Sequence, residues 1–235
     1  MKALAVMAAM SLLIACGGET ENSETADGAN IHADSAGAAS SESDEVEEQV
    51  SYSSLEDYSG IATRELLIEE FGQENLEHGE SWYAEGTVSF QHSELTDPEN
   101  GYVIRYLWEE DGNTLNSIEI DYRVFDDDYN VLNTQEVYSE CGLYTGMPLE
   151  ELREWNGGDF DFHGFKWDYE GAVIAEEGSK LFECVPRVEL ILLDDDARDP
   201  YRFQELWGDR RFNTADDAVQ GAPIFVGRMY YTPSQ

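Results

Sequence analysis

Apolar and polar residues alternate along four stretches of the chain, and this period of two is typical of half-buried strands. The stretches cover residues 82–91, 102–108, 118–125 and 185–193. The dipeptide Asp111-Gly112 follows the second stretch and predicts a tight turn into the third. The pattern therefore predicts a domain that is mainly β, with neighbouring strands joined by short turns.

Two short helices are predicted beside these strands. Thr63 can cap a helix that contains Leu67 and ends at Gly72. Pro148 suits the first turn of a second helix, which ends at Gly157. Because each helix precedes a group of strands, the order predicts an α+β fold, an antiparallel sheet with the short helices packed on one face. The same order is typical of a tandem repeat of one small α+β unit.

Five aromatic rings lie within residues 156–171, whose sequence is NGGDFDFHGFKWDYEG. Two rings occupy even positions and three occupy odd positions: Phe160 and Phe162, then Phe165, Trp167 and Tyr169. A bulge at His163-Gly164, where the parity changes, would let all five rings face one core. The alternative is an open platform of rings for a sugar or a peptide.

The N-terminus has the pattern of an export signal. Lys2 precedes an apolar run that ends at Ala15 and is too short to span a bilayer. Leu13-Ile14-Ala15 directly before Cys16 resembles the bacterial lipoprotein signal, which implies cleavage after residue 15 and acylation of Cys16. The residue after the cysteine is Gly17 rather than the aspartate of inner-membrane retention, which favours the outer membrane. The alternative is an ordinary secretory signal whose cleavage happens to precede a cysteine.

Residues 16–50 have few branched aliphatic side chains and no aromatic ones, so they cannot bury enough apolar surface to offset the entropy of ordering. We expect a disordered acidic tether, with a poorly patterned helix over 43–49 as the alternative. Residues 51–235 remain as one folded α+β domain, and a tandem repeat would divide it into halves 51–140 and 141–235.

The charge is extreme. The whole chain carries a net charge of −38, and residues 51–235 have 12 basic against 41 acidic side chains, a net charge of −29. Such a field repels nucleic acid and anionic lipid headgroups, so we expect no nucleic-acid partner. Lys166 and Lys180 are the only lysines of this domain. This composition is typical of salt-adapted proteins, and cation binding is the alternative source of the acids.

Cys141 and Cys184 are the two remaining cysteines, and an even pair in an exported domain predicts a disulfide. The alternative is a pair of free buried thiols. A catalytic thiol is disfavoured, because neither cysteine has a glycine-rich or histidine-flanked setting.

The segment Gly142–Gly171 has the pattern G-x-x-x-G-M-x-L-x-E-L-x-x-x-N-G-x-x-F-x-F-x-G-F-x-W-D-Y-x-G. This pattern resembles the signature of a family of uncharacterised exported proteins and lipoproteins of Bacteroidota-type bacteria, and 207–209 and 212–214 resemble its C-terminal part. That family usually has glycine at the positions of Lys166 and Glu170, so their charged side chains are expected to face outward. The architecture is also similar to β-lactamase inhibitor protein and to the small SmpA/OmlA lipoproteins. No activity is implied.

Candidate chemistry is sparse, and we expect no catalytic residue, no cofactor and no metal site. Five residues match positions of a calcium-binding loop, namely Asp159, Asp161, His163, Gly164 and Glu170, but the segment alternates like a strand. His78, His92 and His163 lack the spacing of a zinc site, and the acidic runs 126–128 and 194–196 are typical of solvated turns. No nucleophile elbow or phosphate-binding loop occurs.

These features predict a protein anchored in the bacterial cell envelope through Cys16. The function they favour is a non-catalytic protein-binding or assembly module with an envelope protein as partner. We expect the contact on the sheet face that the helices leave uncovered. The alternatives are a small-ligand or inhibitor-type binding protein and then an unrecognised hydrolase with a dispersed pair of carboxylates.

Overall fold

A computed structural model describes residues 52–184, 187–194, 199 and 201–233. These residues belong to one compact unit, Gln49–Gln235. The expected signal peptide, the tether and Cys16 lie outside the described residues. The helices are α1 (Leu55–Ser59), α2 (Arg64–Phe71), α3 (Leu149–Asn156) and α4 (Lys180–Cys184), with short 3-10 turns at Gln73–Asn75 and Gln204–Leu206.

Most of the regular structure is β. The strands are β1 (Leu76–Tyr83), β2 (Val88–Thr96), β3 (Val103–Trp108), β4 (Leu115–Asp121), β5 (Arg123–Phe125), β6 (Val131–Thr134), β7 (Asp161–His163), β8 (Val173–Ile174), β9 (Arg187–Leu192), β10 (Arg211–Asn213) and β11 (Ile224–Tyr231). All the strand pairs are antiparallel. The predicted α+β class is therefore confirmed.

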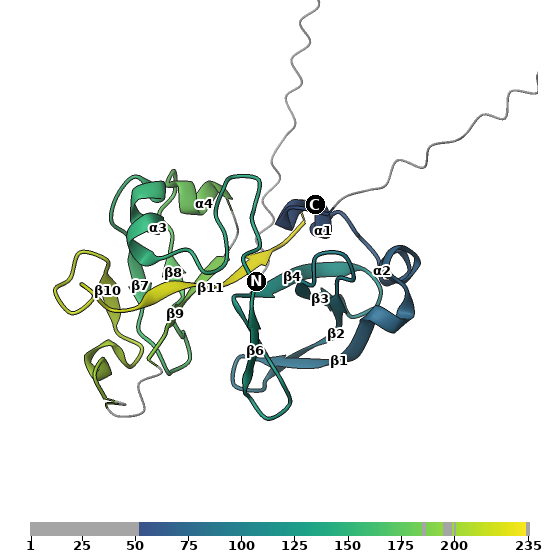
Figure 1. Cartoon of the computed structure of the whole chain (residues 1–235), viewed down its shortest axis with the longest axis horizontal. Coiled ribbons are helices and arrows are strands. Elements are labelled where there is room, and N and C mark those ends of the chain that lie inside the picture. The colour runs from purple at the N-terminus through teal and green to yellow at the C-terminus, as the bar shows by residue number, and fades with distance from the viewer. Residues whose placement is uncertain (1–51, 185–186, 195–198, 200, 234–235) are drawn as a thin grey trace, which may run out of the picture. The chain divides into compact units, whose positions relative to one another are not determined.

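One six-stranded sheet joins the two halves of the domain. Its order is β1-β2-β3-β4-β11-β9, so the last strand of the chain lies between β4 and β9. In Figure 1, β11 runs in yellow from the side of α3, α4 and the smaller sheet β10-β7-β8 towards the group of β1 to β4. Within this sheet, residues 51–140 contribute the four-stranded meander β1 to β4, and residues 141–235 contribute β9 and β11.

Both predicted helices form where their caps indicate. The Thr63 side chain accepts a hydrogen bond from the Leu66 amide and begins α2, which ends at Gly72. Pro148 is the N-cap of α3, one position earlier than expected, and Gly157 ends that helix in the left-handed conformation with φ of 83°.

The apolar face of the six-stranded sheet forms the main core. Side chains from β2, β3, β4 and β11 are buried there: Leu95, Ile104, Tyr106, Ile118 and Met229. Leu95 pairs with Ile104 and Tyr106 pairs with Ile118 across neighbouring strands, and β11 pairs with β4. The Tyr106 hydroxyl donates to a carbonyl of α1 at 3.1 Å, so this helix covers the same face. Helix α1 therefore lies on the apolar face and does not cover the opposite face of the sheet.

Two of the predicted strands are interrupted. The alternating stretch 82–91 is not one strand but the end of β1, a turn over 84–87 and the start of β2. Ala84, Glu85 and Gly86 all have positive φ, which reverses the chain. The stretch 118–125 breaks at Tyr122, whose amide donates to the Gly227 carbonyl at 2.7 Å while its carbonyl accepts from Gln135 at 2.8 Å.

Candidate binding surfaces

The uncovered face of the six-stranded sheet is charged rather than open and apolar. A registered row crosses five strands of this face and alternates in sign over its first three members: Glu94, Arg105, Glu119, Tyr230 and Arg187. Arg105 is central, because its Nη2 lies 2.8 Å from Glu94 Oε2 and its Nη1 lies 3.6 Å from Glu119 Oε2. One guanidinium therefore holds two carboxylates from neighbouring strands.

A second ion-pair group lies beside this row. Arg228 forms a two-pronged ion pair with Asp121, in which Nη2 is 3.2 Å from Oδ2. Its Nη1 contacts Glu189 at 3.7 Å and donates to the Tyr230 hydroxyl at 3.1 Å. That hydroxyl donates in turn to Glu189 at 3.0 Å. We call these side chains and the row above the charged face.

Glu119 is the deepest carboxylate of the charged face, with only 2% of its surface exposed. Burial raises the pKa of Glu119, and the guanidinium of Arg228, the Tyr83 hydroxyl at 2.8 Å and Arg105 act in the opposite direction. Among the described residues, Glu119 Oε2 and Arg105 Nε are buried without a hydrogen-bond partner. Glu119 Oε2 is therefore stabilised by the positive charge of Arg105 and not by a hydrogen bond.

A small pocket of about 120 Å³ lies between the charged face and β5. Its lining residues are Glu94, Val103, Arg105, Glu119, Asp121, Arg123, Val124, Phe125 and Gln135. The space is well below the 300 Å³ or more of a typical ligand site. This described lining has no histidine, cysteine or hydroxyl side chain, and Glu94 and Glu119 share Arg105. Arg105 therefore joins these two carboxylates of the pocket in one ion-pair network.

The β5–β6 hairpin carries a group of exposed apolar side chains. Tyr129 is 87% exposed and Leu132 is 65% exposed, and Phe125 and Val131 are also exposed. Hydrogen bonds shape the tip: Asp126 Oδ1 accepts from the amides of Asp128 and Asn130, and the hydrogen bond from the Asn130 side chain lowers the pKa of Asp126. This acidic turn therefore presents Tyr129 at its end, with φ of 62°.

The aromatic segment divides into buried and exposed rings. Phe160, Phe162 and Phe165 are buried, whereas Trp167 is 62% exposed and Tyr169 is exposed as well. The expectation that all five rings share one core is therefore wrong for the last two. The physical reason is a turn: the chain leaves β7 after His163 and folds back through residues 166–170.

The backbone of the turn over residues 166–170 favours glycine at two positions. Lys166 has φ of 65° and Glu170 has φ of 21°, a region in which glycine is unstrained. Both side chains are exposed, as expected. Gly164 has a different role, because a Cβ there would lie 2.6 Å from the Leu206 carbonyl oxygen. The glycine permits the close approach of two chain segments.

The residues considered for metal binding have other partners. Asp159 pairs with Arg153 through Nε at 2.7 Å, and Asp161 pairs with Arg211 at 2.8 Å. The calcium-loop spacing therefore does not gather these carboxylates. In the described part of the chain, no three His, Cys, Asp or Glu side chains converge as metal ligands.

His78 and His92 lie on the paired strands β1 and β2, at neighbouring register positions, and His163 lies on β7. His78 contacts Ser93 at 2.8 Å, His92 contacts Ser81 at 2.8 Å, and His163 contacts the backbone carbonyl of Asp209 at 3.2 Å. Burial lowers the pKa of His78 and of His92, and the positive charge of Arg64 adds to the effect at His78. These histidines take part in local polar contacts between strands and loops.

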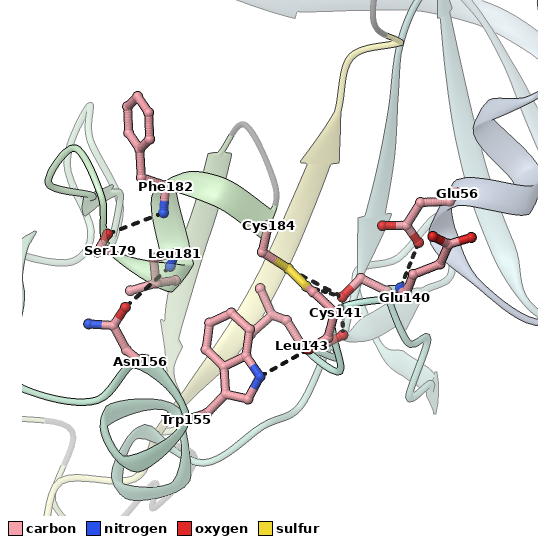
Figure 2. Close-up of a disulfide and its surroundings, with 11 residues drawn as sticks. Glu56, Glu140, Cys141, Leu143, Trp155, Asn156, Ser179, Leu181, Phe182 and Cys184 are labelled. Carbon is pink, nitrogen blue, oxygen red and sulfur yellow. Dashed lines mark hydrogen bonds between the residues drawn. A yellow bond between two sulfur atoms is a disulfide. The ribbon is translucent and has the colours of Figure 1, made fainter. Parts of the chain in front are cut away.

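Cys141 and Cys184 lie at disulfide distance, with their Cα atoms 5.9 Å apart (Figure 2). Ser139 Oγ is 2.9 Å from the Cys141 sulfur, and Trp155 Nε1 donates to the Cys141 carbonyl at 3.2 Å. The pair links the segment before α3 to the end of α4. A bond here would close a loop of 43 residues in sequence separation.

Comparison of the chain with family models, curated proteins and solved structures found no match in any of the three. The similarity to exported lipoproteins therefore stays a prediction. None of the helices in the described ranges has both the length and the apolar character of a membrane-spanning helix.

Proposed function

We propose that this protein is a non-catalytic protein-binding module of the bacterial cell envelope. Cys16 carries the lipid anchor, residues 16–50 form the tether, and the folded domain presents its contact surface on the β5–β6 hairpin. The hairpin replaces the uncovered sheet face as the proposed contact, since that face is filled by ion pairs.

The proposal depends on the exposed apolar side chains of the β5–β6 hairpin. Val131 is paired with Phe125, and Leu132 and Tyr129 are exposed on the same hairpin, in a chain with a net charge of −38. An exposed apolar group on a highly charged protein is typical of a protein-contact site. Aromatic side chains also dominate the energy of many interfaces.

The first experiment measures recovery of a partner. Cells expressing the full chain with Tyr129→Ser and Leu132→Ser are treated with a crosslinker, and crosslinked proteins are quantified by mass spectrometry. Leu66→Ser is the matched control, because Leu66 is an exposed leucine on α2. We expect at least a tenfold loss of one envelope protein with the hairpin variant and no loss with the control. Equal recovery from all three chains would contradict the proposal.

The anchor has its own test. Cells are fed labelled palmitate, and the wild-type chain is compared with Cys16→Ala after purification. Acylation predicts label in the wild type alone, because the cysteine thiol and the new amino group carry the acyl chains. Equal label in both proteins would exclude Cys16 as the acylated residue.

A further inference from the structure

A second surface lies away from the hairpin, on the turn of residues 166–170. This turn, which we call the aromatic turn, has the sequence Lys-Trp-Asp-Tyr-Glu, and all five of its residues are exposed. Exposed rings and exposed carboxylates alternate along it. We propose that the aromatic turn binds the guanidinium groups of an arginine-containing peptide segment. The identity of the peptide rests on the proposed function, because the peptide would belong to the protein partner. The binding site itself is inferred from the residues of the aromatic turn.

The two rings provide open faces for a cation. Trp167 is 62% exposed, and Tyr169 is exposed on one side while His163 stacks on it with ring centroids 4.5 Å apart. A guanidinium over an indole or phenol ring is attracted by the negative face of the ring. Stacking against His163 fixes the orientation of Tyr169, so less side-chain entropy is lost on binding.

The neighbouring charges favour the same ligand. Asp168 and Glu170 flank Tyr169, and both carboxylates are exposed. An arginine that stacks on a ring can extend its fork of N–H donors to a carboxylate beside that ring. An anionic ligand would meet these carboxylates and the net charge of the chain, and a neutral sugar would leave their charge unused. Charge complementarity therefore selects a basic segment.

This region of the molecule already uses cation–ring contacts. Lys166 Nζ lies 4.0 Å from the centre of the Trp207 ring, next to the aromatic turn. Arg210 lies over Phe212 with its guanidinium carbon 4.2 Å from the ring centre. Lys166 is thus occupied by Trp207 and leaves the face of Trp167 to an external cation.

Backbone strain holds the rings outward. Lys166 and Glu170 keep positive φ although neither is glycine, and such conformations persist only where the surroundings impose them. The amide of Glu170 donates to the Trp167 carbonyl at 3.0 Å, and the amide of Ala172 donates to the Tyr169 carbonyl at 2.7 Å. The turn is therefore preformed and needs no folding step on binding.

The test is a titration of the purified full-length chain with a blocked pentapeptide that contains two arginines. The second probe has citrulline in place of arginine, which keeps the shape and removes the charge. Trp167→Leu is compared with Trp82→Leu, because Trp82 is a similarly exposed indole, at 60%, on β1. Asp168→Asn provides a second variant of the site, and thermal melts verify that each variant folds.

We expect Trp167→Leu to weaken binding of the arginine peptide at least tenfold and Trp82→Leu to leave it within about twofold. The citrulline peptide should bind the wild type at least tenfold more weakly. Non-specific attraction to an acidic chain would give equal affinities for both tryptophan variants and would overturn the proposal. Equal affinity for the two peptides would also overturn it, in favour of ring stacking on a neutral ligand. Because the probe is a defined peptide, loss of the in-cell partner would leave this result unaffected.

Discussion

The two faces of the six-stranded sheet are made by the same strands and have opposite chemistry. One face buries Ile104, Tyr106 and Ile118 against α1, and the other places Arg105 between Glu94 and Glu119. Glu119 is nevertheless as inaccessible as many core residues, at 2% exposed. Strand alternation therefore sorts the side chains by face, and a charged side chain at the centre of the polar face can be as buried as an apolar one.

The charged face also shows how a very acidic chain uses its few cations. Arg105 and Arg228 each contact two carboxylates on neighbouring strands. In each case the two carboxylates lie on the strands either side of the arginine, and the guanidinium attracts both of them across the sheet. These arginines therefore compensate acids that range from partly exposed Glu94 to buried Glu119.

The largest effect is expected on the apolar face. Ile118→Ala should lower the free energy of unfolding by about 3 to 4 kcal/mol, because it leaves a cavity in a fully buried layer. Urea denaturation of the wild type and the variant measures the difference. A loss below about 1 kcal/mol would mean that this face is not the main core.

Arg105→Met should come next, with a loss of about 2 to 3 kcal/mol. The substitution removes the guanidinium that pairs with Glu119 and leaves this carboxylate buried. Removal of one partner of a buried ion pair is strongly destabilising. Adding Glu119→Gln to Arg105→Met should recover part of the loss, since it removes the uncompensated charge. Additive losses in this double-mutant cycle would show that the two side chains are not coupled.

Glu119→Gln alone should change how stability depends on pH. Burial raises the pKa of Glu119 in the folded chain, so the folded state binds this proton more tightly than the unfolded state. The contribution of Glu119 to stability is then fully present below the unfolded value of 4.5 and falls as the pH rises through the folded pKa. Relative to wild type, Glu119→Gln should gain stability between pH 4 and pH 7 in urea denaturation. The exposed Glu69→Gln on α2 is the matched control, and a constant difference for Glu119→Gln across that range would contradict the raised pKa.

The smallest effect is that of salt. Raising sodium chloride from about 0.05 M to about 2 M shortens the screening length from above 10 Å to below 3 Å. Relief of repulsion among exposed carboxylates should then raise the melting midpoint by about 2 to 4 °C, equivalent to about 1 kcal/mol. The shift should be the same in Glu119→Gln, because buried pairs are screened little. A midpoint that falls with salt would show that exposed ion pairs dominate the stability.

Local signals in the sequence predicted much of the fold. The caps of α2 and α3 depend on neighbouring residues, so Thr63, Gly72 and Gly157 could be read directly. The hairpin turn of β1 and β2 was missed, because Ala84 and Glu85 rarely adopt positive φ and only Gly86 marks the turn. The place of β11 was also missed, since pairing between β4 and the end of the chain has no local signal.

The binding surfaces were harder to predict than the fold. Ring alternation over 160–169 predicted core positions, but the strained turn at Lys166 and Glu170 exposes two of the rings. The apolar side chains of the β5–β6 hairpin resemble an ordinary strand in sequence, and only the tertiary structure shows that nothing described covers Leu132. The pairing of Cys141 with Cys184 could be predicted from the sequence alone, because residues 51–235 contain just these two cysteines.

Site-specific photo-crosslinking tests the proposed function most directly. A photoreactive amino acid is placed at Leu132 on the hairpin or at Leu66 on α2, and intact cells are irradiated. We expect one discrete adduct with an envelope protein from position 132 and none of that size from position 66. The same adducts from both positions, or no adduct from position 132, would contradict it.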